Sequence, residues 1–208
     1  MARSIDDGTV VSYTTWQGSH LTLTSYQGKY VEVLLPASWV AGLTQEERRT
    51  LIDRSDLLYE RYKELVGVEP GGTGLLPIAM VDATCGWGCG YVGAKGIEIA
   101  DDAGSLSTLK GELSKGFSNG VLVHEMCHNF DVFAAYLHYL PDHAHAWTDF
   151  LNAYMFTYDR EGTPDQAPAE ALQNYIDQYF TPYTSQPTAN WQQCVRDSGC
   201  TTKTDTRL

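Results

Sequence analysis

The sequence predicts a single α+β domain with a mixed or antiparallel sheet, one helix that carries a candidate site, and a mainly helical C-terminal part. Three observations support this fold class. Residues 9–35 alternate between apolar and polar side chains, as half-buried strands do. Residues 45–66 open with a helix-capping sequence and continue with apolar residues at helical spacing. Residues 119–140 are mostly apolar and contain no proline, so they can form a helix of about 20 residues.

Length and composition indicate how the chain is organised. A chain of 208 residues can bury a substantial core as one domain, and no internal repeat or obvious linker divides it. We therefore expect one domain over residues 1–208. Within it we expect a sheet-containing lobe over 1–118, a helical part with the candidate site over 119–200, and a polar tail over 201–208.

Charge and hydropathy exclude several classes of function. A composition of 43% hydrophobic and 19% charged residues is typical of a soluble globular protein. No apolar run approaches the roughly 18 residues that a membrane-spanning helix needs. The net charge of −12 disfavours binding to nucleic acid and to anionic membrane surfaces. We expect a monomer without a membrane span.

The N-terminal strands are delimited by turn residues. Gly18 and the Gln27–Gly28 pair interrupt the alternation, which predicts two or three antiparallel strands. Pro36 ends the last of them, since proline cannot donate a ladder hydrogen bond.

A helix over about 45–66 follows these strands. Thr44 and Glu47 have the spacing of a capping box, and Gly67 is a typical stop. Its core-facing stripe is predicted to consist of Leu51, Leu58, Tyr62 and Leu65.

The central region contains shorter predicted elements. Residues 69–74 are glycine-rich but lack the Gly-Lys-Ser/Thr ending of a phosphate-binding loop, so we interpret them as a turn. A buried strand is predicted over 75–82 and a loop over 85–90. A strand or hairpin is predicted over 91–100, and a short helix or irregular link over 105–115.

The five cysteines favour an oxidising compartment. Cys85 and Cys89 flank a Gly-Trp-Gly loop, and Cys194 and Cys200 lie near the C-terminus, so each pair can close a local disulfide. Pairing between the two sets and a Cys85/Cys89 zinc site remain alternatives, although no second pair lies near enough to complete such a site. Cys127 is expected to be a small buried apolar residue. No signal-peptide core precedes the domain, so it is either cytosolic or a mature secreted domain with an added start methionine, and the cysteines favour secretion.

The strongest chemical signal is His124-Glu125-Met126-Cys127-His128, which has the pattern H-E-x-x-H. Residues four apart lie on the same face of a helix, so His124 and His128 can offer two imidazole nitrogens to one metal ion. Glu125 can act as general base on a water molecule activated by that ion. Ser118 or Asn119 can cap the helix. An incidental pair of core histidines is the alternative, but burying them beside Glu125 without a partner would be costly.

A catalytic zinc ion needs a third protein ligand. While the helix stays straight, Asp131 lies too far along its axis to bind the same ion, but it can orient His128 by a hydrogen bond. The metzincin pattern would need glycine at Asp131 and histidine at Ala134, which excludes that class. The third ligand should therefore come from a second helix that Asp142 caps after Pro141. Its candidates are His145, Asp149 and His143.

A helix with H-E-x-x-H, a turn and a second helix that gives the third ligand resembles the gluzincin branch of the zincin metallopeptidases. The run His-Glu-Met-Cys-His-Asn over 124–129, followed by 147–154, is similar to the enhancin-type peptidases, and the resemblance covers roughly residues 78–158. That family has a glutamate about where His145 stands, and no glutamate occurs between Glu125 and Glu161. We therefore expect His145 to replace it, with Asp149 as its hydrogen-bonding partner or as an alternative ligand.

The resemblance implies a secreted zinc endopeptidase acting on protein or glycoprotein. It also implies that a tyrosine or histidine steadies the oxyanion, and that an edge strand, assigned to residues 96–100, binds substrate as an added strand. The loop around Trp87 is expected to wall one side of the cleft. Two alternatives stay open: a non-catalytic zincin scaffold that binds protein or glycan, and zinc-dependent hydrolysis of a non-peptide amide. The candidates for the oxyanion role are Tyr136, His138, Tyr154 and Tyr158.

Overall fold

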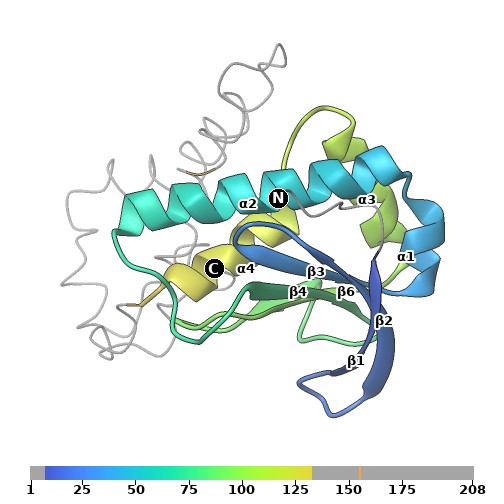
Figure 1. Cartoon of the computed structure of the whole chain (residues 1–208), viewed down its shortest axis with the longest axis horizontal. Helices are drawn as coiled ribbons and strands as arrows, with labels where there is room; N and C mark the ends of the chain where they lie inside the picture. Colours follow the sequence, from blue (N-terminus) through green and yellow to red (C-terminus); the bar gives the residue numbers. More distant parts are fainter. Residues whose placement is uncertain (1–7, 133–154, 156–208) are drawn as a thin grey trace, which may run out of the picture.

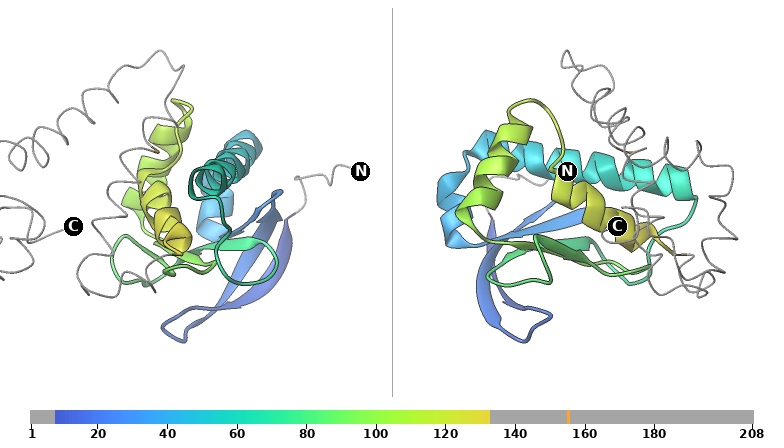
Figure 2. Two further views of the ribbon diagram at one scale, coloured as in Figure 1. Left: turned by 90° about the vertical axis from the view of Figure 1, so that its left-hand side faces the viewer. Right: turned by 180° about the vertical axis from the view of Figure 1, so that it is seen from behind.

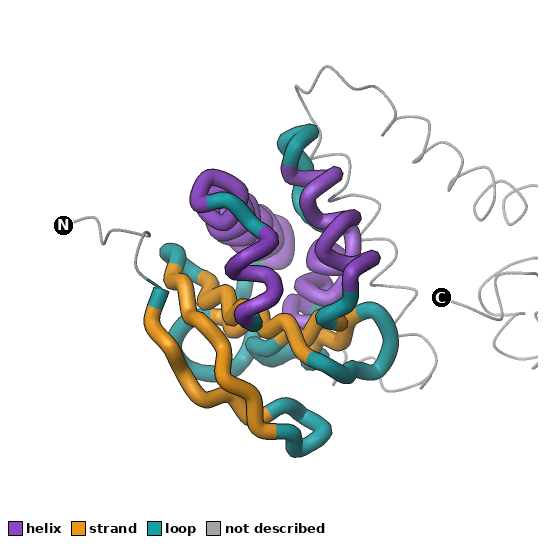
Figure 3. Tube along the Cα trace, turned by 90° about the vertical axis from the view of Figure 1, so that its right-hand side faces the viewer, coloured by secondary structure: helices purple, strands orange, loops and turns teal. Residues whose placement is uncertain are grey.

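The computed structural model describes residues 8–132 and Met155. In this part of the chain, six strands form one mixed sheet, and four helices cover one of its faces (Figures 1 and 3). This arrangement confirms an α+β fold with a mixed sheet. Within the described residues, no helix is both long and apolar enough to pass through a bilayer.

Three antiparallel strands begin the sheet, as the alternation predicted. Strand β1 (Thr9–Thr14) pairs with β2 (His20–Gln27), and β2 pairs with β3 (Val31–Leu35). Pro36 follows β3 directly and caps α1 (Ala37–Gly42), a single short helix that the sequence analysis did not predict.

The other half of the sheet is mainly parallel. Strand β3 pairs in parallel with β4 (Leu76–Val81), and β4 pairs in parallel with β6 (Ile97–Ala100). The short strand β5 (Gly88–Gly90) runs antiparallel to β6 and forms the outer edge. The strand order is β1-β2-β3-β4-β6-β5.

The long helix α2 (Gln45–Val66) has the predicted boundaries. The Thr44 side chain accepts from the backbone N–H of Glu47, the Glu47 carboxylate accepts from the N–H of Thr44, and Gly67 ends the helix in a left-handed conformation. Leu51, Leu58 and Tyr62 are buried as expected. Leu65 is 39% exposed, so its assignment to the core was wrong: at the end of the helix Val66, not Leu65, packs against the core.

Helices α3 (Ala103–Leu113) and α4 (Gly120–Phe130) complete the layer over the sheet (Figure 2). The buried Tyr62 hydroxyl on α2 donates to the carbonyl oxygen of Val123 on α4 at 2.8 Å, which ties the two helices together. The main core lies between these helices and the sheet, and Met155 also packs into it.

Asp56 of α2 holds the turn between β2 and β3. Its carboxylate accepts backbone hydrogen bonds from Lys29 at 2.6 Å, Tyr30 at 2.7 Å and Val31 at 3.1 Å. Without this carboxylate, three backbone donors near the core would lose their partner. Leaving partly buried donors unsatisfied is costly.

We expect Asp56→Ala to lower the free energy of unfolding by about 2–3 kcal/mol, measured by urea denaturation. The matched control is Asp53→Ala, one turn earlier on α2. Asp53 makes only an exposed ion pair with Arg49 at 3.8 Å, which is worth about 0.5 kcal/mol or less. Equal losses in the two variants would contradict the role assigned to Asp56.

Candidate metal centre

The start of helix α4 is fixed by two side chains. Asn119 caps it and accepts from the backbone N–H of Leu122 at 3.0 Å, as one of the two predicted caps. Glu112 at the end of α3 accepts from the Asn119 side-chain amide at 2.6 Å and from the backbone N–H of Gly120 at 3.2 Å. A carboxylate at a helix N-terminus is favourable because it meets unpaired N–H groups and the positive end of the helix dipole. The sequence analysis missed Glu112 because its partners follow a connecting turn.

Helix α4 ends at Phe130, so the expectation of a helix reaching residue 140 was wrong. The backbone N–H of Gly93 donates to the His128 carbonyl at 2.9 Å, and the N–H of Asp131 donates to the same oxygen at 3.1 Å. That carbonyl would otherwise accept from residue 132 in the next turn. Asp131 has a ψ of 58°, outside the helical range. Asp131 therefore does not lie on a straight continuation of α4, as the sequence analysis assumed.

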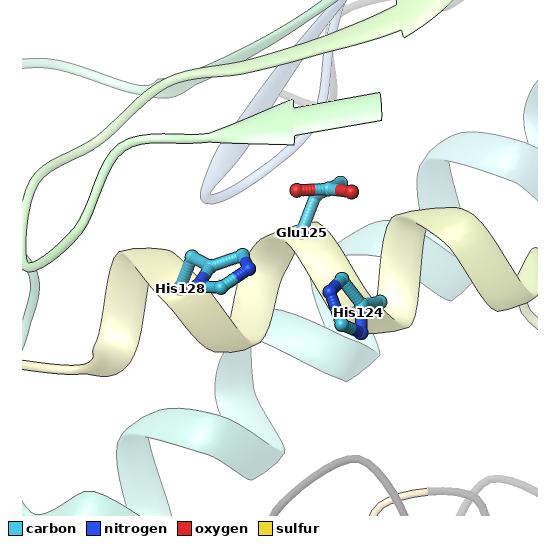
Figure 4. A group of neighbouring side chains, drawn as sticks. All are labelled: His124, Glu125 and His128. Atoms are coloured by element: carbon cyan, nitrogen blue, oxygen red, sulfur yellow. The ribbon is translucent and has the colours of Figure 1, made fainter. Parts of the chain in front are cut away.

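The three motif residues come together on α4 (Figure 4). The ligand atoms of His124, Glu125 and His128 all lie within 4.8 Å of one another, and the two imidazole ring centroids are 5.0 Å apart. Glu125 and His128 are buried, while His124 is partly exposed. A search of the described residues for three or more His, Cys, Asp or Glu side chains close enough to share a metal ion gives this group.

Glu125 lies in an environment that disfavours its charge. Burial raises its pKa to about 7, and a hydrogen bond from the backbone N–H of Gly90 partly opposes that rise. A general base works best when its pKa is close to the working pH. A cation bound by the neighbouring histidines would lower the pKa again.

The edge strand β5 packs directly against α4. A Cβ atom on Gly90 would lie 2.2 Å from the backbone oxygen of Glu125 and 3.1 Å from the Cβ of His128. A Cβ atom on Gly88 would lie 2.7 Å from the side chains of Glu125 and Val121. Only glycine permits so close an approach. Figure 4 shows the Glu125 side chain on the side of the helix that faces the strands.

Residues 96–100 were expected to form an edge strand, and this expectation was wrong. Strand β6 lies between β4 and β5, so both of its sides are paired. The edges of the described sheet are β1 and β5, and β5 forms from the second half of the predicted 85–90 loop. The predicted Cys85–Cys89 disulfide is present and closes this loop, and Cys127 is fully buried in the core as expected.

A cavity of about 740 Å³ lies beside two of the three motif residues. It lies between α3 and α4, and His124 and Glu125 line it, whereas His128 does not. Trp87 also lines it, and the Trp87 side chain is 79% exposed. In the described structure, a ligand in the cavity would therefore meet His124 and Glu125.

Of the other predicted site residues, the structure describes only Asp131. Asp131 is 2% exposed and does not belong to the group with metal-ligand spacing. The predicted third ligand and its alternatives lie outside the described residues, as do the oxyanion candidates and the second cysteine pair: His143, His145, Asp149, Tyr136, His138, Tyr154, Tyr158, Cys194 and Cys200.

Comparison with protein-family models, with curated protein sequences and with solved structures gives no match for this chain. The functional proposal therefore depends on the chemistry of the residues on α4 and their surroundings.

Proposed function

We propose that this protein is a zinc-dependent metallopeptidase with a zincin-like fold, which hydrolyses peptide bonds in protein or glycoprotein substrates. One observation carries the proposal: the ligand atoms of His124, Glu125 and His128 lie within 4.8 Å of one another, and His124 and Glu125 line a cavity. The pattern H-E-x-x-H on a helix is typical of zinc peptidases.

The donor set fits a zinc ion. Two imidazoles, one helical turn apart, offer the nitrogen ligands that zinc prefers, and a carboxylate lies next to them. We assign the third ligand to His145, with Asp149 as the alternative.

A zinc ion at this site would supply a Lewis acid that makes a water molecule more acidic and polarises a peptide carbonyl. Glu125 accepts a proton from that water and passes it to the nitrogen of the leaving amine. The Gly90 N–H keeps the Glu125 carboxylate oriented during both transfers. Burial keeps its pKa high enough for it to take up a proton and release it again.

Strand β5 is the proposed docking strand for the substrate. Of the two edge strands in the described sheet, β1 and β5, it is the one whose glycines lie against the helix that carries Glu125. An extended peptide can add to such an edge through main-chain hydrogen bonds. A peptide added there lies close to Glu125.

An oxidising, extracellular location is also proposed. The Cys85–Cys89 disulfide supports it, because structural disulfides persist mainly outside the reducing cytosol.

The test combines metal analysis with hydrolysis of a protein substrate. Purified protein should contain about one zinc ion per chain. Glu125→Gln should keep the zinc and lose about 100-fold or more in hydrolysis rate, because it removes the general base. Glu46→Gln, an exposed change at the start of α2, is the matched control and should keep full activity.

Two outcomes would overturn the proposal. Full activity in Glu125→Gln would remove the assigned general base, and wild-type protein without zinc would remove the metal. Zinc binding without hydrolysis of any peptide library would favour the non-catalytic scaffold that binds protein or glycan.

A further inference from the structure

The cavity beside the candidate site has an apolar interior. It lies between α3 and α4 and reaches down to strands β4 and β6 (the layers are seen in Figure 2). Its deepest side chains belong to the core and are each at most 4% exposed. These side chains are Trp39, Leu51, Met80, Ile99, Leu109 and Leu122.

The carboxylates on the cavity wall already have partners. Asp102 caps α3 by accepting from the backbone N–H of Ser105 at 2.7 Å. Glu112 accepts from Asn119 and Gly120 at the start of α4. These hydrogen bonds compensate part of the two charges. The remaining negative charge, with that of Glu125, disfavours an acidic ligand group.

The volume and position of the cavity point to a peptide side chain as its occupant. At about 740 Å³ it falls in the range of pockets that enclose a ligand group, roughly 300–1,000 Å³. His124, Glu125 and the exposed Trp87 all line the cavity, so it adjoins the proposed catalytic residues. A peptide lying along β5 next to Glu125 would therefore bring the side chain of a residue beside the bond under attack to the cavity.

We propose that this cavity is the specificity pocket of the site and takes a bulky apolar side chain, best an aromatic one, from a residue adjoining the scissile peptide bond. That the bound residue adjoins a cleaved bond rests on the proposed function. Binding of its side chain in the pocket requires no zinc. Burial of an aromatic side chain among apolar walls is favourable, whereas a carboxylate there would lose its hydration beside other negative charges.

Two neighbouring positions on α3 give a matched pair of variants. Thr108 is exposed and lines the cavity, so Thr108→Trp adds a large ring to the cavity wall. Ser107 is also exposed on α3 but does not line the cavity, so Ser107→Trp is the control. Both positions accept a large side chain without disturbing buried residues.

The binding test uses the full-length Glu125→Gln protein, which cannot turn the probe over, with methionine methyl groups labelled for NMR. Met80 lines the cavity, whereas Met126 is buried in the core and does not line it. The probes are two N-acetylated tripeptide amides, with phenylalanine or glutamate between two alanines.

The phenylalanine probe should shift the Met80 methyl resonance in a saturable manner and leave Met126 unchanged. The glutamate probe should bind at least about 10-fold more weakly. Thr108→Trp should lose the Met80 response, and Ser107→Trp should keep it. An unchanged Met80 resonance, an equal response to both probes, or a normal response in Thr108→Trp would overturn the pocket assignment.

Hydrolysis separates this inference from the function on which it rests. With the wild-type zinc-loaded protein, peptides with phenylalanine beside the cleaved bond should be cut roughly 10- to 100-fold faster than those with glutamate. Cleavage without this preference would overturn the pocket while the peptidase proposal stands. A Met80 response without any cleavage would support the pocket and reject the peptidase.

Discussion

Replacing His128 with alanine is expected to abolish stoichiometric zinc binding. His128→Ala removes one of the two imidazoles on α4 that are the proposed zinc ligands. Even the loss of a group that only orients a metal ligand weakens metal affinity by about 10- to 100-fold. We expect the loss for His128→Ala to exceed about 100-fold, and His124→Ala to behave in the same way. Titration with a competing chelator, followed by metal analysis, measures the change.

His20→Ala is the control for the histidine variants. His20 is exposed on β2, where its ring shares a hydrogen bond with Thr14, and it lies on a different element from the candidate centre. Its replacement should leave zinc content unchanged. If His128→Ala held zinc as tightly as His20→Ala, the ion would have to be bound elsewhere on the protein.

The second large effect is expected for Gly90→Ala, because the new methyl group would collide with main-chain atoms. It would lie 2.2 Å from the backbone oxygen of Glu125 and 3.0 Å from its carbonyl carbon, and neither atom can move by a change of rotamer. Strand β5 must then move away from α4. We expect a loss of about 3 kcal/mol in the free energy of unfolding, at the upper end of the usual cost of overpacking. If β5 moves away, the hydrogen bond from the Gly90 N–H to the Glu125 carboxylate weakens, and we expect the proposed hydrolysis to slow.

Gly111→Ala provides the contrast. A methyl group at Gly111, inside α3, meets no atom within 4 Å. Alanine favours a helix over glycine by up to about 1 kcal/mol, so this variant should be slightly more stable than the wild type. Thermal and urea unfolding of the two variants will show whether the close approach of β5 to α4 causes the loss of stability in Gly90→Ala. Equal stability of both variants would contradict the packing argument.

Local signals explain the parts of the fold that the sequence predicted. The alternation of residues 9–35, the capping box at Thr44 and the stop at Gly67 act between near neighbours, so they can be recognised without knowledge of the tertiary structure. The proximity of His124, Glu125 and His128 follows from helical spacing alone. The Cys85–Cys89 disulfide likewise closes a short loop.

The features that the sequence did not predict depend on distant partners. Helix α4 ends early because Gly93, far back in the chain, donates to the carbonyl of His128. Strand β6 is internal because β5, which precedes it, pairs on its outer side. The cavity forms only where α3 and α4 meet over the sheet. Strand order and helix contacts of this kind are not encoded in the periodicity of any one segment.

The glycine contacts of β5 restrict the positions at which substitutions can change ligand preference without moving the strand. At Gly90 backbone meets backbone, so the spacing between β5 and α4 is set by main-chain atoms and is insensitive to exchanges of other side chains. In the proposed peptidase, selectivity can instead vary on the outer turns of α3, including Thr108, without moving β5 relative to Glu125. Redesign of ligand preference should therefore start on α3 and leave Gly88 and Gly90 untouched.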